Sequence, residues 1–271
     1  LFPLFTWMNR SYAAPPIAIS IIFGALLTKV GLYSIIRTYG LFYYESNFIK
    51  SYILILGAVS IIAGCIGAIY QKDLKQIVIF NIVISLGVMV CGTATLNTFG
   101  VKGALFYAVN NILLKAALFI VVGLIIYVSG VKYLQKCGLI NKYPLLGWTY
   151  FIIVLSLAGV PPFSGFYGKA LIIKGLVTNN NTFIAILVAL SGLVVFYSLI
   201  RIFLNVFYDN INKSLILKPL PKGVQIPLIA IVAIALIIGV STNLLDGFFD
   251  KGIQMVLNPQ HYIDLVLKKG A

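Results

Sequence analysis

The sequence is poor in acidic side chains, in histidine and in cysteine. Its 271 residues include only six Asp and Glu, one histidine and three cysteines. The lone histidine, His261, lacks the cluster of ligands that a metal site requires. The cysteines show no paired spacing for a metal or a disulfide framework, so we expect Cys65, Cys91 and Cys137 to be packing residues. No cysteine cluster, glycine-rich phosphate loop or histidine pair for haem is present, and the sequence therefore predicts no cofactor.

Charged residues of any kind are scarce. They make up 10% of the chain against 61% hydrophobic residues, whereas a soluble domain has about 25% charged and about 45–50% apolar residues. The net charge of +14 would suggest a nucleic-acid partner in a soluble protein. Here most basic residues lie between apolar runs, where they set orientation and meet anionic lipid headgroups. We therefore predict a lipid bilayer as the surroundings and no nucleic-acid partner.

Long hydrophobic runs are abundant, and they predict an all-α polytopic membrane bundle. A bilayer core of about 30 Å needs about 20 apolar residues in a helix. Seven segments meet this requirement, approximately 15–37, 51–70, 76–96, 101–129, 145–177, 182–208 and 224–247. We expect 1–247 to form the transmembrane domain and 248–271 an interfacial tail. Because the chain opens LFPLFTWMNRSY without an initiator Met, we also expect it to be the later part of a longer chain.

The basic residues are distributed unevenly between the two sets of loops. One side carries Arg10, Lys72, Lys75, Lys132, Lys136, Lys142, Lys213, Lys218 and Lys222. The other side carries Lys50, Lys251, Lys268 and Lys269. The positive-inside rule therefore predicts that the first set is cytoplasmic and that the C-terminus is outside.

Three lysines lie inside the apolar segments: Lys29, Lys115 and Lys169. A lysine at the bilayer centre costs about 2.5–3.5 kcal/mol on insertion scales and commonly marks an ion or proton pathway. All six carboxylates fall in predicted loops or at the ends of spans, so none is placed to neutralise these lysines. The lysines must be neutral for part of the time, hydrated, or paired with acids from elsewhere, because burial disfavours the charged form. We interpret them as a proton or ion relay; the alternative is static glue between helices.

The fifth predicted span contains SLAGVPPFSGFYGK, which predicts a broken helix. Pro161 and Pro162 remove backbone donors, while Gly165 and Gly168 relax the backbone. Non-helical backbone at membrane depth is tolerated where it is buried in protein or lines a wet cavity, which predicts hydration beside Lys169. The alternative is a proline kink that serves packing alone.

Four polar residues near the lysines can hold water between them: Tyr107, Asn110, Asn111 and Ser164. For each one taken alone, a polar contact between packed helices is the simpler interpretation.

Four ordered motifs resemble a known family: GALLTKVGLYSIIR after WMNRSYAAPP, QKDLKQIVIFN, NNILLKAALF and LAGVPPFSGFYGK. The chain is similar to the proton-translocating antiporter-like subunits shared by respiratory complex I and Mrp-type antiporters, above all to the D subunits of Mrp-type Na⁺/H⁺ antiporters. The resemblance implies a bacterial plasma-membrane protein of fourteen helices in two inverted five-helix repeats, of which this chain holds roughly the second half. Other subunits of a membrane antiporter or respiratory complex, protons and Na⁺ are the implied partners.

The resemblance also assigns the lysines. Lys29 matches the family's central lysine on the eighth helix, Lys115 the lysine on the eleventh, and Lys169 the lysine on the broken twelfth helix near the outward half-channel. The family's fifth-helix glutamate and seventh-helix lysine would precede Leu1, so we expect that the chain alone does not transport. Asn110 and Asn111 stand where many relatives have a histidine, and Asn81 stands at a position often held by a histidine or a hydroxyl residue.

Three functions stay open on the sequence. The first is proton translocation in a Na⁺ (cation)/H⁺ antiporter. The second is the same role in NADH:quinone oxidoreductase or a related redox complex. The third is a scaffold subunit whose lysines only anchor neighbours.

Overall fold

The computed structural model describes residues 1–43, 46–208 and 218–240, and residues 247, 250, 253 and 256. The α-helices are α1 (Thr6–Ala13), α2 (Ile17–Ile22), α3 (Thr28–Phe42), α4 (Asn47–Tyr70), α5 (Leu74–Ala94), α6 (Thr98–Ser129), α7 (Pro144–Ala158), α8 (Ser164–Thr178), α9 (Thr182–Ile202) and α10 (Lys222–Val240). A π-helical turn, η1 (Phe23–Leu27), joins α2 to α3, a short 3₁₀ turn, η2 (Leu139–Asn141), precedes α7, and a second π-helical turn, η3 (Phe203–Tyr208), extends α9. No strand occurs among these residues, and the predicted all-α bundle is confirmed.

Among the described residues, five helices are long and apolar enough to cross a membrane: Ile17–Phe42, Asn47–Tyr70, Leu74–Ala94, Thr98–Ser129 and Thr182–Tyr208. The predicted fifth span is instead two shorter helices, α7 and α8, because it is interrupted as expected. The predicted seventh span corresponds to α10, a shorter apolar helix in the described part of the chain. The short helix α1 was not predicted, and the tail 248–271, with His261, lies outside the described residues apart from three positions.

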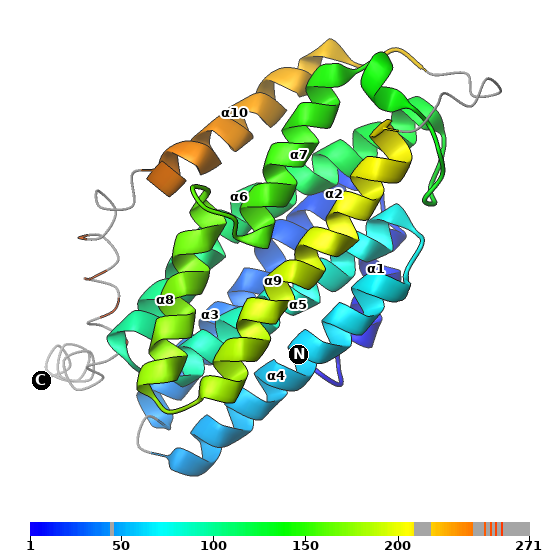
Figure 1. Ribbon diagram of the computed structural model, residues 1–271. Coiled ribbons are helices and arrows are strands. Elements are labelled where there is room, and N and C mark those ends of the chain that lie inside the picture. The colour runs from blue at the N-terminus through cyan, green and yellow to red at the C-terminus, as the bar shows by residue number, and fades with distance from the viewer. Residues whose placement is uncertain are drawn as a thin grey trace, which may run out of the picture.

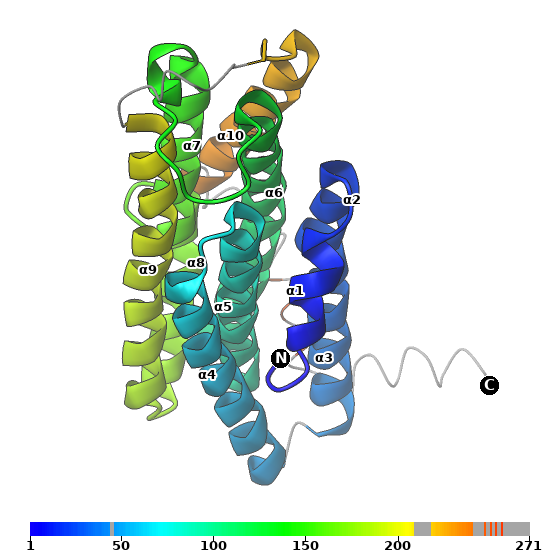
Figure 2. The ribbon, with the colours of Figure 1, turned by 90° about the vertical axis from the view of Figure 1, so that its right-hand side faces the viewer.

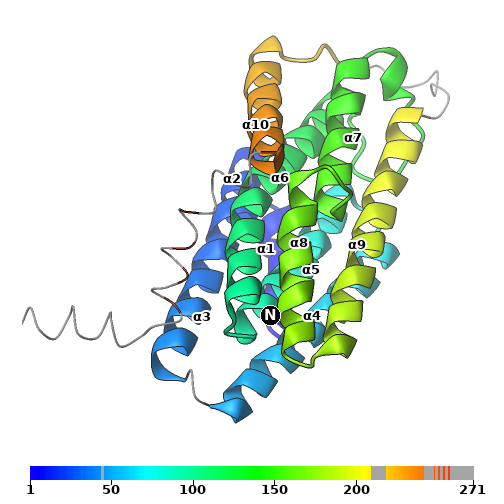
Figure 3. The ribbon, with the colours of Figure 1, turned by 60° about the vertical axis from the view of Figure 1, so that its left-hand side comes forward.

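Helices α5 and α6 form the centre of the bundle. Nearly all of α5 is buried, although its hydropathy is close to that of α4 and of the α9 span, which are mostly exposed. The α2–η1–α3 span lies against one side of α6, and α8 and α9 lie on the other side (Figures 1 and 2). Helix α4 packs along α5, and α10 lies beside α6 and α7 at one end of the bundle (Figure 3). Side chains carried by α6 therefore face elements that come from both ends of the sequence.

Helices α6 and α8 approach closely because small residues line their contact. A Cβ at Gly168 would lie 2.8–3.1 Å from atoms of Tyr107, and one at Gly175 would lie 2.5 Å from the backbone nitrogen of Gly100. Apolar residues gain little from meeting each other in lipid, so close backbone approach and polar contacts hold such helices together. This contact fixes the distance between the residues of α6 and Lys169 on α8.

Two side chains fix the turns at opposite ends of the bundle. Asn97 accepts a hydrogen bond from the Gly100 amide (2.6 Å) and donates one to the Gly175 carbonyl (2.7 Å), so it joins the α5–α6 turn to α8. At the other end, the Arg201 guanidinium donates to the carbonyls of Ile69 and Gln71, where α4 ends. These bonds satisfy backbone groups that helix ends leave unpaired.

Candidate functional site

The break between α7 and α8 leaves two backbone carbonyls without helical partners. Helix α7 ends at Ala158, and Gly159 follows with a φ of 85°, a left-handed conformation that suits glycine. In a continuous helix the carbonyl of Leu157 would accept from the amide of residue 161, and that of Ala158 from residue 162. Both positions are proline, which has no N–H. The sequence thus determines which carbonyls are freed.

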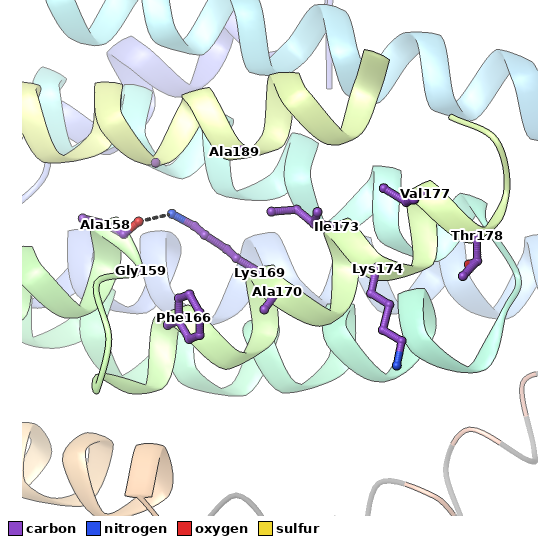
Figure 4. Close-up of a pocket in the computed structure, with 11 residues that line it drawn as sticks. Ala158, Gly159, Phe166, Lys169, Ala170, Ile173, Lys174, Val177, Thr178 and Ala189 are labelled. Carbon is purple, nitrogen blue, oxygen red and sulfur yellow. Dashed lines mark hydrogen bonds between the residues drawn. The ribbon is translucent and has the colours of Figure 1, made fainter. Parts of the chain in front are cut away.

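Lys169 satisfies both of these carbonyls. Its Nζ donates a 2.7 Å hydrogen bond to the Ala158 carbonyl (Figure 4) and a 3.1 Å hydrogen bond to the Leu157 carbonyl. The side chain is 6% exposed, and its ammonium lies 5.7 Å from the centre of the Tyr107 ring. Because the C-terminal end of a helix carries partial negative charge, the end of α7 favours a cation here.

A pocket of about 510 Å³ adjoins the Lys169 ammonium. Its walls come from the end of α7, from α8 and from α9, and its lining residues are Ala158, Gly159, Phe166, Lys169, Ala170, Ile173, Lys174, Val177, Thr178, Ala189 and Gly192. Lys174 points away from Lys169 (Figure 4), and its ammonium lies 3.8 Å from the centre of the Phe99 ring. Of the two lysines that line the pocket, Lys169 is therefore the buried one and Lys174 the exposed one.

Three polar side chains connect the break to α6. The Ser164 hydroxyl, at the first residue of α8, donates to Oδ1 of Asn110 over 2.6 Å and lies 3.2 Å from the Ser156 hydroxyl of α7. Nδ2 of Asn110 is buried and makes no hydrogen bond within the described part of the chain, and the amide of the buried Asn111 interacts with the Tyr107 side chain. A buried polar atom without a partner is costly, so this part of α6 favours bound water.

Lys115 occupies the middle of α6 and is 1% exposed. Its charge lies within electrostatic range of both Lys29 and Lys169. Helix α6 itself contacts η1 on one side and α8 on the other. Lys115 is therefore carried by the helix that packs between η1, just before Lys29, and α8, which carries Lys169.

Lys29 is the second residue of α3, one residue beyond the π-helical turn η1. Its Nζ donates to the carbonyl of Gly24 over 3.3 Å, and the Thr28 hydroxyl donates to the same carbonyl over 3.3 Å. Single π-helical turns widen the helix and are frequent at functional sites. Gly24 packs against the Phe119 ring of α6, so the turn that holds Lys29 is anchored on the helix that carries Lys115.

Of the residues predicted from the sequence, Tyr107, Asn110, Ser164, Gly168 and Lys169 lie close together around the break. Asn81 lies apart from them. Asn81 of α5 donates to the Ser198 hydroxyl of α9 over 3.0 Å. Sequence reasoning missed Ser156 and the carbonyls of Gly24, Leu157 and Ala158. In a helix each amide bonds to the carbonyl four residues earlier, so Pro161 and Pro162 would have identified the carbonyls of Leu157 and Ala158. Nothing in the sequence indicates the π-helical turn.

Helices that are long and apolar enough to cross a membrane, together with a span that is broken between α7 and α8, define the chain as a multi-pass membrane protein. Residues 1–194 match the family described as "NADH:quinone oxidoreductase/Mrp antiporter, TM", and the chain belongs to this family.

Curated relatives include the D subunit of the Na⁺/H⁺ antiporter of Bacillus subtilis strain 168, 39% identical over 99% of this chain and 55% of the relative. The D subunit of the Alkalihalophilus pseudofirmus antiporter is 36% identical over the same shares. The chain thus spans about half the length of these relatives. Among solved structures, a chain of the Mrp complex from Dietzia sp. DQ12-45-1b has the same fold, with a TM-score of 0.93 at 22% identity over 98% of this chain and 58% of that one.

Proposed function

We propose that this chain translocates protons through Lys29, Lys115 and Lys169 as part of a subunit of a cation/proton antiporter, with Na⁺ as the exchanged cation. The observation that carries the proposal is the placement of three buried lysines on α3, α6 and α8, with Lys115 within electrostatic range of both others. Like charges in a medium of low polarity repel strongly. A proton held by one lysine therefore disfavours a proton on its neighbour, which is the coupling that a relay needs.

The surroundings of the lysines support this interpretation over a static role. No carboxylate lies near their ammonium groups among the described residues, so no ion pair fixes their charge. Lys29 and Lys169 each bond to carbonyls that a helix irregularity exposes. The unpaired Nδ2 of the buried Asn110 offers a position for water between α6 and the break. Water in such positions can carry protons between lysines that are too far apart to touch.

A second candidate is the corresponding role in a redox-driven complex. Chains of similar fold occur in the sulfane sulfur reductase MBS, with a TM-score of 0.86. The antiporter is favoured because the curated relatives at 39% and 36% identity are named as Na⁺/H⁺ antiporter subunits. A scaffold role is the third candidate, and it predicts that the lysines are dispensable for transport.

The test uses the full-length protein within its assembled complex in inverted membrane vesicles. Addition of Na⁺ to vesicles with a preformed pH gradient should dissipate that gradient, and Lys29→Ala, Lys115→Ala or Lys169→Ala should each abolish the response. Lys142→Ala, which changes an exposed lysine before α7, is the matched control and should retain it. Exchange at the wild-type rate in the three lysine variants, with assembly confirmed, would overturn the relay and favour the scaffold role.

A further inference from the structure

We propose that a basic pocket at one end of the bundle binds the headgroup of an anionic membrane lipid through its phosphodiester. The pocket has a volume of about 590 Å³, within the range of about 300–1,000 Å³ that is typical of small-molecule sites. Its lining residues are Ala13, Ala14, Pro15, Pro16, Ile17, Asp73, Lys75, Ile126, Lys132 and Tyr133. None of the three buried lysines belongs to this set, and the proposal does not depend on the proposed function.

The pocket lies where three spans end. Ile17 is the first residue of α2, Lys75 is the second residue of α5, and Ile126 lies in the last turn of α6. Each of these helices belongs to a segment that is long and apolar enough to cross a membrane. The ends of such segments lie at the level of the lipid headgroups. A ligand of this pocket is therefore placed at the membrane surface.

Contacts between the three segments hold the pocket in shape. Nζ of Lys75 donates hydrogen bonds of 3.0 Å to the carbonyls of Ala13 and Pro15, which joins the start of α5 to the segment before α2. An antiparallel bridge between Asp73 and Tyr133 joins the same end of α5 to the loop that follows α6. The walls are thus positioned before a ligand binds, which lowers the cost of binding.

The charges of the lining match one phosphodiester. Lys75 and Lys132 are basic and Asp73 is acidic, so the lining has a net charge of +1. Lys132 lies within electrostatic range of Lys75, and an anion beside both relieves their repulsion. An ammonium group has three donors, so Lys75 keeps one beyond its two carbonyl partners.

The acidic residue favours a ligand with a single negative charge. Oδ1 of Asp73 accepts hydrogen bonds from the amides of Lys75 and Gln76, so this carboxylate caps α5 and stays at the pocket. A phosphate monoester carries about 1.5 to 2 negative charges at pH 7. It would exceed the positive charge of the lining, whereas a phosphodiester with one negative charge is balanced by it.

The apolar part of the surface favours a lipid over a soluble phosphodiester. Ile17 and Ile126 line the pocket beside the charged groups. Further along α2, toward the membrane interior, Ile19 is 42% exposed and Ile22 is 57% exposed. These side chains offer contacts to acyl chains once the headgroup is bound. Tyr133, an exposed aromatic residue of the lining, is typical of the interface between membrane and water.

The experiment measures binding at the pocket itself, in the assembled complex that contains the full-length protein. The complex is placed in phosphatidylcholine nanodiscs with increasing amounts of phosphatidylglycerol that carries a photoreactive diazirine beside its headgroup. After illumination, mass spectrometry measures the adducts on residues 131–134. Labelling of the wild type should saturate, and unlabelled phosphatidylglycerol should compete with it. Phosphatidylcholine and glycerophosphoglycerol, the same headgroup without acyl chains, should not compete.

Four variants test the charges of the pocket. Lys132→Ala should raise the half-saturating amount of lipid about fivefold, because one basic residue near anionic lipid contributes about this factor. Lys132→Arg keeps the charge and should bind like the wild type. Asp73→Asn keeps a helix cap but loses the opposing charge, so it should lower the half-saturating amount about fivefold. Lys142→Ala changes an exposed lysine that does not line the pocket and should have no effect.

The variants of Lys132 separate lost binding from lost folding. Lys132 is exposed, and it meets α5 through its backbone carbonyl, which accepts a hydrogen bond from the Leu74 amide over 3.0 Å. Its side chain is therefore dispensable for the fold.

Equal competition by phosphatidylcholine, or equal half-saturation in Lys132→Ala and Lys142→Ala, would overturn the site. Competition by glycerophosphoglycerol as strong as that by the intact lipid would replace the lipid with a soluble anion and overturn the proposal. Weaker labelling of Asp73→Asn would contradict the charge balance on which it rests.

Discussion

The hydroxyl of Ser164, at the start of α8, donates a 2.6 Å hydrogen bond to Oδ1 of Asn110 in the middle of α6. Both side chains are fully buried, and the bond crosses from the broken helix to the helix that carries Lys115. Ser156, near the end of α7, completes a group that touches both halves of the break. The position of the break relative to the central lysine is therefore fixed by side-chain hydrogen bonds as well as by packing.

Replacement of Ser164 by alanine should destabilise the bundle. The change leaves Oδ1 of Asn110 buried without its donor, and a lost partner of this kind costs about 1–3 kcal/mol. Ser34→Ala is a suitable control because the exposed Ser34 hydroxyl bonds only to the Val30 carbonyl of its own helix. Thermal unfolding of the complex in detergent should show a lower midpoint for Ser164→Ala alone. Equal midpoints for the two variants would show that the hydrogen bond from Ser164 to Asn110 does not fix the break against α6.

Two glycines in the first span should respond differently to alanine. A Cβ at Gly24 would lie 3.1 Å from Cδ1 of Ile82 and would collide with the Phe119 ring, whereas a Cβ at Gly31 meets nothing within 4 Å. Overpacking of this kind costs about 1–3 kcal/mol, while alanine at an open helical position is favourable by about 0.5–1 kcal/mol. Gly24→Ala should also move Lys29, whose ammonium bonds to the Gly24 carbonyl.

The measurement for this pair is cation-driven proton exchange together with unfolding temperature. Gly24→Ala should reduce both, and Gly31→Ala should leave exchange unchanged with equal or higher stability. If Gly24→Ala retained both properties, the π-helical turn would have enough freedom to move away from Phe119, and its contact with α6 would not position Lys29.

Most of the fold could be predicted from the sequence because hydrophobic length decides membrane helices. The broken helix was predictable from local sequence, because Pro161 and Pro162 have no backbone N–H and interrupt helical hydrogen bonding in any tertiary context. The π-helical turn before Lys29 was not predictable, because no local residue pattern indicates it; in the structure its Gly24 packs against Phe119, 95 residues later in the chain. The bond from Ser164 to Asn110 joins residues 54 positions apart and likewise depends on the tertiary fold.

The membrane orientation stays a prediction, and labelling can test it. The starts of α7 and α9 lie at opposite ends of the bundle (Figure 1). Lys142, just before α7, and Thr182, the first residue of α9, are both exposed. The positive-inside rule predicts that the Lys142 end is cytoplasmic. In intact cells, a membrane-impermeant maleimide should label Thr182→Cys but not Lys142→Cys, and inverted vesicles should give the opposite result. Labelling of Lys142→Cys in intact cells would reverse the predicted topology.

The last prediction concerns the protonation chemistry of α6 at Asn110. An amide donates and accepts hydrogen bonds but does not titrate in the physiological range, whereas histidine has a reference pKa of about 6.5. Asn110 is fully buried, with Oδ1 bonded to Ser164 and Nδ2 unpaired within the described residues. A histidine here would add a group that changes charge between about pH 5 and 8 beside the proposed water positions.

Asn110→His in the assembled complex should therefore change the pH profile of cation-driven exchange within that window. Asn110→Gln is the matched control, since it also enlarges the side chain but adds no titration, and its profile should keep the wild-type shape even if its rate falls. The rates are compared after normalisation to the amount of assembled complex. If the histidine and glutamine variants gave profiles of the same shape, proton passage would not involve position 110, and the unpaired Nδ2 of Asn110 would have to be explained by helix packing.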